Sequence, residues 1–277
     1  MKTLGLIGPG RWGSKYLLPM NGGEHITAVL SRSAYDAPLW CRSMTDTEAF
    51  FSLGLDGVIV STGPESHVEL ALRAIESGAG VLVEKPLALD WSGCARIIEA
   101  AQKSGLPLLV SSPHLWAERF VAKLARRPEQ AHDVEAHFGG PAHSGYSDWL
   151  DWGPHLVAMS LAAFRYREPH TVDIYGDRAT NFARFPEWEG RTERVLRFRG
   201  GSASLEVTQE TSRFFRIEYG DGELWDYDDE DHPPDEHTPM WHMARTFQDL
   251  LRGGTDQRAD LSFTRAIYGI LFGEQGG

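Results

Sequence analysis

Residues 4–13 read Leu4-Gly5-Leu6-Ile7-Gly8-Pro9-Gly10-Arg11-Trp12-Gly13. The apolar residues 4–7 predict a buried strand, and a G-x-G-x-x-G pattern follows it without a gap. In a dinucleotide-binding loop the first glycine permits a tight turn, the second lets the backbone approach a pyrophosphate, and the third lets the next helix pack on the strand. The N-terminus of that helix offers unpaired N–H groups to the anion. We therefore expect the cofactor's phosphates at Gly8, Pro9, Gly10, Arg11, Trp12 and Gly13, although a chain with 29 glycines also allows a purely structural turn here.

The pattern beyond this loop predicts a parallel sheet with crossover helices. Short apolar runs alternate with amphipathic stretches up to about residue 112, which is the order of a doubly wound α/β domain. One helix is expected to begin at Ser66, where Ser66-x-x-Glu69 has the form of a capping box, and to stop at Gly78. A second helix is expected over residues 92–103. The predicted strands cover residues 4–7, 26–30, 58–61, 81–83 and 108–110. Residues 1–112 are therefore predicted to form a Rossmann domain.

From about Leu115 the order of elements changes to that of an α+β domain. Successive strands separated by turn residues favour antiparallel pairing. We therefore predict a substrate-binding and oligomerisation domain over residues 113–277, with a mostly antiparallel open sheet and final helices that can pack back on the first domain. The predicted helices cover residues 116–126, 151–164, 240–251 and 261–272, and the predicted strands cover residues 134–138, 171–175, 194–198, 203–208 and 214–219.

Charge and composition exclude several classes of protein. The chain of 277 residues is 42% apolar and 24% charged, which is typical of a globular protein of about two domains. Its formal net charge of −12 argues against nucleic acid or an anionic membrane as partners. Nine of the 39 carboxylates lie in the acidic segment, Asp221 to Glu236. Pro233-Pro234 favours a solvated loop there over a metal site with His232 and His237, and no metal is predicted elsewhere.

The sequence also predicts a cytoplasmic protein. No stretch approaches the ~20 continuous apolar residues of a membrane span, and residues 1–3 run directly into the first strand rather than into a signal peptide. Cys41 and Cys94 are too few for a disulfide framework. We expect both cysteines to be reduced thiols.

The choice of cofactor depends on the end of the strand 26–30. The residue that faces the adenosine ribose is expected there, about 20 residues after the glycine loop, and the sequence reads Ser31-Arg32-Ser33. A carboxylate at this place binds the ribose 2′-OH of NAD and repels a 2′-phosphate, whereas an arginine flanked by hydroxyls attracts the phosphate. Ser31, Arg32 and Ser33 therefore favour NADP over NAD. The alternative is a solvated arginine and use of either cofactor.

Three further motifs resemble those of a known family. Residues 62–67 read Thr-Gly-Pro-Glu-Ser-His, residues 84–86 read Glu-Lys-Pro, and residues 151–155 read Asp-Trp-Gly-Pro-His. In this order they are similar to motifs of the glucose-fructose oxidoreductase, inositol dehydrogenase and rhizopine-catabolism (Gfo/Idh/MocA) family. The resemblance implies that the cofactor is bordered by Thr62, His67, Glu84 and Lys85.

The resemblance also implies a catalytic trio of Lys85, Asp151 and His155, and a substrate site of Lys85, His114, Trp152 and His155. Asp151 and His155, four positions apart, share a face if their segment is helical. A histidine has the pKa suited to take a hydroxyl proton as hydride leaves for the nicotinamide, and the Lys85 ammonium can stabilise the substrate oxygen. We expect Lys85 and His155 to converge on one carbinol, with a purely structural role as the alternative for each.

The implied activity is that of an NAD(P)-dependent dehydrogenase or reductase acting on a secondary alcohol or ketone of a sugar, sugar derivative or cyclitol. The alternatives are a non-catalytic dinucleotide-binding sensor and a redox-assisted glycosidase that retains its NAD. The resemblance further implies a homodimer or homotetramer. The chain departs from the family's pattern where Tyr146-Ser147-Asp148-Trp149 replaces a glycine triplet, where Ala158 replaces an aspartate, and at residues 112–116. The second domain is expected to be trimmed and its pocket reshaped, which leaves the substrate open.

Overall fold

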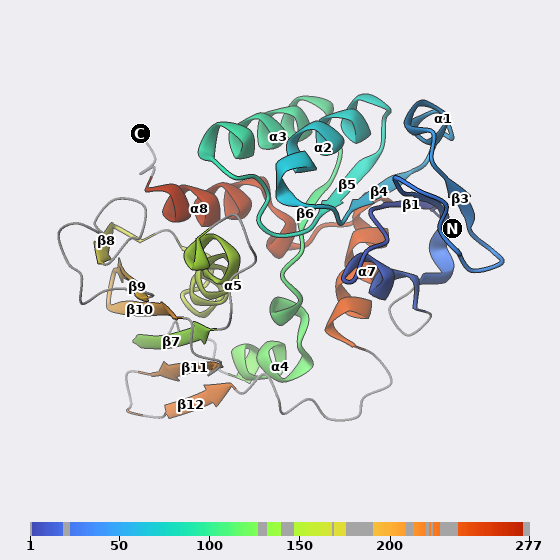
Figure 1. Ribbon diagram of the computed structural model, residues 1–277. Helices are drawn as coiled ribbons and strands as arrows, with labels where there is room; N and C mark the ends of the chain where they lie inside the picture. The colour runs from blue at the N-terminus through green and yellow to red at the C-terminus, as the bar shows by residue number, and fades with distance from the viewer. Residues whose placement is uncertain are drawn as a thin grey trace. The chain divides into compact units, whose positions relative to one another are not determined.

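The computed structural model describes residues 2–18, 23–126, 132–139, 147–167, 169–175, 191–208, 213–219, 222, 224–227 and 238–273. The chain forms two units, each assembled from two segments (Figure 1). The first unit contains Met1–Trp116 and Asp235–Arg265, and the second contains Ala117–Pro234 and Ala266–Gly277. Each unit is built around a six-stranded sheet.

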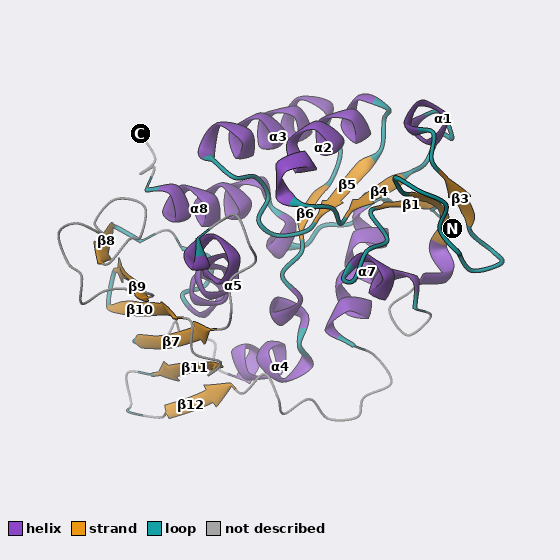
Figure 2. Cartoon of the chain, viewed as in Figure 1, coloured by secondary structure: helices purple, strands orange, loops and turns teal. Residues whose placement is uncertain are grey.

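The first unit contains a parallel sheet with the strand order β3-β2-β1-β4-β5-β6 (Figure 2). β1 pairs with β2 on one side and β4 on the other. The earlier strands therefore extend the sheet to one side of β1 and the later strands extend it to the other, so the strand order reverses at β1. β1, β4 and β5 are buried along their whole length, as expected for the centre of a parallel sheet. The predicted Rossmann fold is confirmed. Its strands are β1 (Leu4–Ile7), β2 (Ile26–Leu30), β3 (Arg42–Met44), β4 (Gly57–Val60), β5 (Gly80–Val83) and β6 (Leu108–Val110).

Two helices connect the last three strands of this sheet and pack on each other, α2 (His67–Glu76) and α3 (Trp91–Ser104). α3 is capped by the Asp90 carboxylate, which accepts a backbone N–H bond of 2.7 Å from the first turn. The capping box predicted at Ser66 is wrong. The Ser66 hydroxyl makes no cap bond, because it donates to the Gly63 carbonyl at 2.9 Å in a 3₁₀ turn that precedes the helix.

Two short elements of the first unit are missing from the sequence-based assignment, the strand β3 and the helix α1 (Thr47–Phe51). β3 has three residues, of which only Met44 is buried, so it shows no apolar alternation. Residues 31–41, all of which the structure describes, form no helix between β2 and β3. This connection therefore lacks the helix that each crossover between β4 and β6, on the other side of β1, contains.

The segment 238–265 completes the first unit. Helix α7 (Pro239–Leu250) packs on the 3₁₀ helix η5 (Pro113–Trp116), and the Trp116 indole N–H donates to the Thr246 hydroxyl at 2.8 Å. The Arg258 guanidinium donates to the carbonyl of Leu115 at 3.0 Å. A late part of the chain thus belongs to the unit formed by its start.

The second unit contains a mixed sheet with the order β12-β11-β7-β10-β9-β8. All strand pairs are antiparallel except β7 with β10, which lie parallel at the centre. The mostly antiparallel sheet is confirmed, while the central parallel pair is a feature that the sequence pattern does not indicate. Its strands are β7 (Asp133–Gly139), β8 (Thr171–Tyr175), β9 (Arg191–Phe198), β10 (Gly201–Thr208), β11 (Arg213–Glu218) and β12 (Leu224–Tyr227).

Helices cover this sheet. α5 (Asp148–Ala163) packs across the central strands β7 and β10. α4 (Glu118–Arg126) is joined to β11 by an edge-to-face contact of Phe120 with Phe215, whose ring centroids lie 5.8 Å apart. α8 (Leu261–Phe272), at the bounds predicted from the sequence, contacts α5 instead, where the Trp149 indole N–H donates to the Leu271 carbonyl at 3.4 Å.

The acidic segment is a loop only in part. Residues 224–227 form β12, so the prediction of a loop is wrong for these residues. His232, His237 and most of the segment's carboxylates lie outside the described residues. Within the described ranges, no three His, Cys, Asp or Glu side chains are arranged to hold a metal ion.

Both cysteines are free and buried. Burial raises the pKa of each thiol, that of Cys41 to about 11. Of the helices in the described parts of the chain, none has the length and apolar character needed to cross a membrane.

Candidate active site

The predicted cofactor residues lie at one edge of the parallel sheet. Gly8 follows β1, Ser31 follows β2 and Glu84 follows β5, while Thr62 is the second residue after β4. The carboxyl ends of parallel strands share an edge, so residues far apart in sequence are brought together there. The glycine loop leaves this edge at β1, where the strand order reverses.

The glycine loop combines two crowded positions with one open position. Gly8 has a left-handed φ of 85°, and its N–H donates to the Leu30 carbonyl at 3.0 Å. A Cβ on Gly13 would lie 2.1 Å from the Gly8 carbonyl oxygen. At Gly10, by contrast, no heavy atom of the described residues lies within 4 Å of a Cβ position. The fold requires glycine at positions 8 and 13, whereas the space at Gly10 is what a pyrophosphate against the backbone needs.

The helix after the loop is shorter than expected. η1 (Gly13–Leu17) is a 3₁₀ helix of five residues. The Ser14 N–H donates to the Gly10 carbonyl at 2.9 Å and the Lys15 N–H to the Trp12 carbonyl at 3.0 Å, so these two donors are engaged within the loop. A phosphate site here depends on the loop backbone, because a single short turn has only a small macrodipole.

A buried hydrogen-bond cluster joins the glycine loop to the end of β5. The Glu84 carboxylate accepts bonds from the Trp12 indole N–H, at 2.6 Å, and from the Tyr16 hydroxyl. The Tyr16 hydroxyl oxygen also lies 3.2 Å from that of Ser111. Burial and, next, the Glu84 charge raise the pKa of Tyr16 well above its usual value, so this hydroxyl stays protonated. Glu84, predicted to border the cofactor, therefore has protein donors on its carboxylate.

His67 joins two turns at the same edge. Its ring is fully buried, with Nδ1 2.8 Å from the Pro86 carbonyl oxygen and Nε2 3.1 Å from the Thr62 carbonyl oxygen. Burial lowers the pKa of His67 against the opposing effect of these carbonyls, which keeps the ring neutral near pH 7. The Thr62 hydroxyl is bonded to that of Ser66 at 2.7 Å. His67 thus lies between the turn after β4 and the turn that contains Lys85, and its neutral ring donates to one of the two carbonyls. A cofactor contact of its side chain stays a prediction.

Ser31-Arg32-Ser33 leave the sheet at the end of β2. The Ser31 N–H donates to the Met44 carbonyl of β3 at 3.0 Å, and the Ser31 hydroxyl donates to the Ser33 carbonyl. The Arg32 side chain is exposed. This placement suits a phosphate ligand and a solvated arginine equally.

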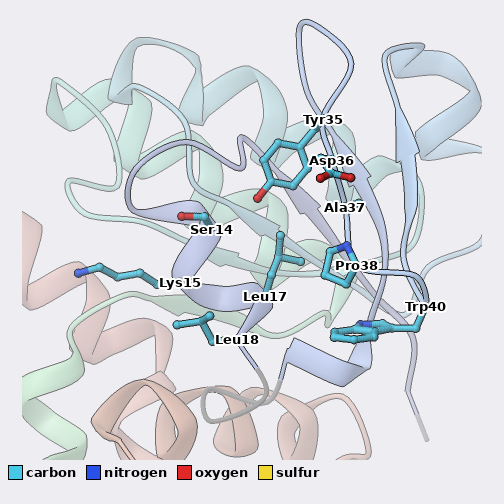
Figure 3. A pocket seen from close by; sticks show the side chains of 9 residues that line it. All are labelled: Ser14, Lys15, Leu17, Leu18, Tyr35, Asp36, Ala37, Pro38 and Trp40. Atoms are coloured by element: carbon cyan, nitrogen blue, oxygen red, sulfur yellow. The ribbon is translucent and has the colours of Figure 1, made fainter.

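A pocket of about 530 Å³ lies between η1 and residues 35–40 of the next loop (Figure 3). Tyr35 and Trp40 approach it from the loop, and Ser14 and Leu17 approach it from η1. It lies beside the connection from β2 to β3, which lacks a helix. None of the described lining residues is a predicted site residue. They are Ser14, Lys15, Leu17, Leu18, Tyr35, Asp36, Ala37, Pro38 and Trp40.

Two predicted substrate residues lie after neighbouring strands of the first unit. Lys85 is half-buried, two residues past β5, and a cis peptide bond joins it to Pro86. His114 is half-buried in η5, which follows β6. β5 and β6 pair in parallel, so both residues follow the same edge of the sheet.

The remaining predicted catalytic residues lie on α5 in the second unit. Asp151 and His155 are 0% and 5% exposed, and their spacing of four places them on one helix face. The His155 ring centroid lies 6.4 Å from that of Phe138 on β7, and Trp152 beside the pair is half-buried. Lys85 belongs to the first unit, so its convergence with His155 on one carbinol stays a prediction.

The start of α5 explains part of the Asp-Trp-Gly-Pro-His motif. The helix begins at Asp148, three residues earlier than predicted, because the Ser147 hydroxyl caps it. A Cβ on Gly153 would lie 2.9 Å from the Trp149 ring and 3.0 Å from Leu271 of α8. The glycine of the motif therefore has a packing role, independent of any chemistry at Asp151 or His155.

Comparisons with known proteins agree with this architecture. Residues 2–112 match a family model described as "Oxidoreductase family, NAD-binding Rossmann fold". A 4-carboxy-2-hydroxymuconate-6-semialdehyde dehydrogenase of Sphingobium sp. is 32% identical over an alignment of 194 positions that covers 64% of this chain and 58% of that protein. An inositol 2-dehydrogenase of Corynebacterium glutamicum (strain R) is 27% identical over an alignment of 114 positions that covers 38% of this chain and 34% of that protein. The matched regions thus span less than two thirds of either relative.

A solved structure extends the likeness to both units. UDP-N-acetylglucosamine 3-dehydrogenase from Acidithiobacillus ferrooxidans has a TM-score of 0.80 with this chain, over 98% of this chain and 96% of that one. The sequence identity is 18%. At this identity the likeness confirms the fold of the chain and nothing finer.

Proposed function

We propose that the protein is an NAD(P)-dependent dehydrogenase or reductase, because residues 2–112 match the model of the Gfo/Idh/MocA oxidoreductase family. Its proposed substrate is a secondary alcohol or ketone of a sugar, sugar derivative or cyclitol. Both curated relatives described above are named dehydrogenases, and one is named for inositol. We also propose a homodimer or homotetramer, which light scattering of the purified protein tests.

One observation carries the proposal, the open position at Gly10 within an otherwise crowded loop. The fold fills the space around Gly8 and Gly13 with its own backbone but leaves Gly10 clear, at the edge of the sheet where Lys85 also lies. A loop of this form is suited to a pyrophosphate, and the adjacent edge is where ligands of open α/β sheets bind. Unlike Gly8 and Gly13, Gly10 is required neither by a left-handed φ nor by crowding.

The proposed cofactor is NADP, with NAD as the alternative. The glycine loop would hold the pyrophosphate, and the exposed Arg32 between Ser31 and Ser33 would bind the ribose 2′-phosphate. The bound nicotinamide would accept or supply the hydride. No carboxylate stands at residues 31–33 to repel a 2′-phosphate.

The side chains of the proposed trio divide the work on the substrate. His155 takes the hydroxyl proton in oxidation and returns it in reduction, since imidazole exchanges protons near neutrality. Asp151, one helical turn earlier, orients this ring or shares its proton. The Lys85 ammonium binds the substrate oxygen and stabilises negative charge that develops on it. His114 and Trp152 are the proposed further contacts to the substrate.

A screen of sugars and cyclitols tests the function, with the absorbance of reduced cofactor as readout and both NAD and NADP supplied. The expected result is net formation of free reduced cofactor with at least one polyol, faster with NADP. Cofactor binding without turnover of any substrate would favour a non-catalytic sensor. Product formation without net reduction of free cofactor would favour a redox-assisted glycosidase. A protein that binds neither dinucleotide contradicts the proposal.

A further inference from the structure

We propose that Glu84 is a positioning residue, which holds the glycine loop in its binding conformation through Trp12, rather than a ligand of the cofactor. The inference rests on the proposed function, because it assumes that the loop binds a dinucleotide. Its basis is a set of contacts inside the first unit that joins the loop to the residue directly before Lys85.

Two donors that flank the last glycine of the loop converge on one oxygen of Glu84. Trp12 Nε1 lies 2.6 Å from Oε1, and the Tyr16 hydroxyl binds the same oxygen. Trp12 stands between the second and third glycines, and Tyr16 stands on η1 directly after them. The Glu84 backbone is itself fixed, because its N–H donates to the Val60 carbonyl of β4 at 2.9 Å. The end of the sheet therefore holds both the loop and the turn that follows it.

Burial strengthens the anchor, by which we mean the hydrogen bonds from Trp12 and Tyr16 to the Glu84 carboxylate. Glu84 is 6% exposed and Tyr16 is 1% exposed, so water has little access to the carboxylate itself. Hydrogen bonds to an ionised acceptor are about twice as strong as bonds between neutral groups. A buried carboxylate that loses a donor is costly, because its charge is then less compensated. Conformations of the loop that withdraw Trp12 are disfavoured for this reason.

Trp12 depends on these polar contacts for its position. Its side chain is 43% exposed, so packing alone fixes it poorly. The Lys15 ammonium lies 3.9 Å from the ring centroid, a cation–π contact with the ring face, while Glu84 binds the N–H at the ring edge. Figure 3 shows the Lys15 side chain, which borders the pocket described above, extending away from residues 35–40. The indole is thus held at both its face and its edge.

The anchor affects binding through preorganisation. A loop with three glycines has a large conformational entropy when free, and binding to a flexible loop must offset that entropy. Fixing Trp12 fixes the backbone beside the open position at Gly10, where the pyrophosphate is proposed to lie. Since Glu84 directly precedes Lys85, the same contact also ties the loop to the turn that carries the substrate-binding lysine.

Two ligands and a double variant together distinguish a positioning role of Glu84 from direct contact of its side chain with the cofactor. Dissociation constants are measured for ADP-ribose, which carries the pyrophosphate, and for adenosine, which does not; the 2′-phosphorylated forms replace both if the parent binds NADP more tightly than NAD. Trp12→Phe and Glu84→Gln are each expected to weaken the pyrophosphate ligand by roughly 5- to 30-fold and the other ligand by less than about twofold. The double variant is expected to lose no more than the worse single variant, because both changes break one interaction.

Trp116→Phe is the matched control. It removes an indole N–H bond of similar length, 2.8 Å to Thr246, in the same unit but away from the loop. It is expected to lower stability without altering the ratio of the two ligand affinities. Tyr16→Phe removes one donor and leaves the Trp12 bond, so its effect should fall between that of Glu84→Gln and the parent.

The outcomes separate the proposal from its rivals. Multiplying losses in the double variant would show that Glu84 contacts the cofactor independently of Trp12 and would overturn the proposal, as would equal losses for both ligands. A parent protein that binds no dinucleotide overturns the proposed function instead. Amide hydrogen exchange of residues 10–14 then decides the anchor alone: faster exchange in Glu84→Gln and Trp12→Phe than in Trp116→Phe supports it, and equal exchange contradicts it.

Discussion

The two units use buried ionisable residues in different ways. In the first unit, Glu84 and His67 are buried between turns, and their side chains bind protein donors and carbonyls. In the second unit, Asp151 and His155 are buried on one face of a single helix. We propose that the first pair supports the backbone and that the second pair transfers protons. Burial is common to both pairs, so burial alone does not distinguish the two proposed roles; the element that carries each pair does.

Replacing His155 and His67 is the strongest test of this proposed difference in role. His155→Asn is expected to lower turnover by about 10²- to 10⁴-fold, the usual worth of a general acid–base group, while cofactor affinity stays near the parent value. His67→Gln is the comparison, expected to weaken cofactor binding and stability but to retain most turnover at saturating cofactor. Steady-state kinetics and cofactor titration measure both. Equal losses of turnover in the two variants would remove the distinction between them.

Within the first unit, we propose the same division for the glycines of the loop, with Gly13 supporting the fold and Gly10 binding the cofactor. Gly13→Ala is expected to lower the free energy of unfolding by roughly 1–3 kcal/mol, because its Cβ would lie 2.1 Å from the Gly8 carbonyl oxygen. Gly10→Ala should leave stability within about 0.5 kcal/mol of the parent, as its Cβ enters open space, but should weaken cofactor binding. Urea unfolding and cofactor titration check both. Unchanged cofactor affinity in Gly10→Ala would contradict the proposed pyrophosphate position.

The elements of the fold were predictable where apolar periodicity was strong. β1, β2 and α8 have the bounds that the sequence predicts, because each is an unbroken apolar or amphipathic run. β3 was not predictable, since two of its three residues are exposed at the edge of the sheet. β12 lies within a run of carboxylates that reads as a loop, and its pairing with β11 overrides that local signal. Pairing partners are set by tertiary contacts, which is also why the parallel centre of the second sheet was missed.

The location of the predicted cofactor residues at one edge of the sheet was predictable from the sequence, whereas their contacts were not. The glycine pattern and the Glu-Lys-Pro motif indicate which strand ends carry polar groups, and the structure places them at one edge. Neither motif indicates that Trp12 donates to Glu84, since 72 positions separate them. Tyr16 and Ser111 lie outside every motif, and no sequence signal identifies them as partners of that carboxylate. Side-chain hydrogen bonds between distant elements follow from packing, which a single sequence does not display.

The exposed Arg32, which follows β2, allows the choice between NADP and NAD to be tested. Arg32→Ala is expected to weaken NADP binding by roughly 1–3 kcal/mol, the worth of a lost charge-assisted contact, and NAD binding far less. Arg42→Ala is a matched control, because Arg42 is also exposed and lies on β3 in the same unit. Calorimetric titration with both dinucleotides provides the comparison. Equal losses for NAD and NADP would assign Arg32 to the solvent instead.

The pH dependence of stability tests the supporting role of His67 with the smallest expected effect. Burial lowers the pKa of this ring in the folded protein, whereas in the unfolded chain it titrates near 6.5. Below that pH the unfolded state binds a proton that the folded state does not, so stability present above about pH 6.5 is lost as the pH falls toward the folded pKa. One proton changes the free energy of unfolding by at most about 1.4 kcal/mol per pH unit.

His67→Gln isolates this contribution, because glutamine does not titrate while every other group, including the nearby Glu65 and Glu84, is kept. Urea unfolding of parent and variant between pH 5 and 8 gives the difference in stability as a function of pH. The difference is expected to be constant from pH 7 to 8 and to shrink below about pH 6.5, as the parent loses the advantage of a neutral buried ring. The carbonyls of Thr62 and Pro86 favour the protonated ring, so they limit how far the pKa falls. A difference that grows on acidification would mean that these carbonyls outweigh burial and that His67 is held as a cation, which would reverse the sign of its contribution.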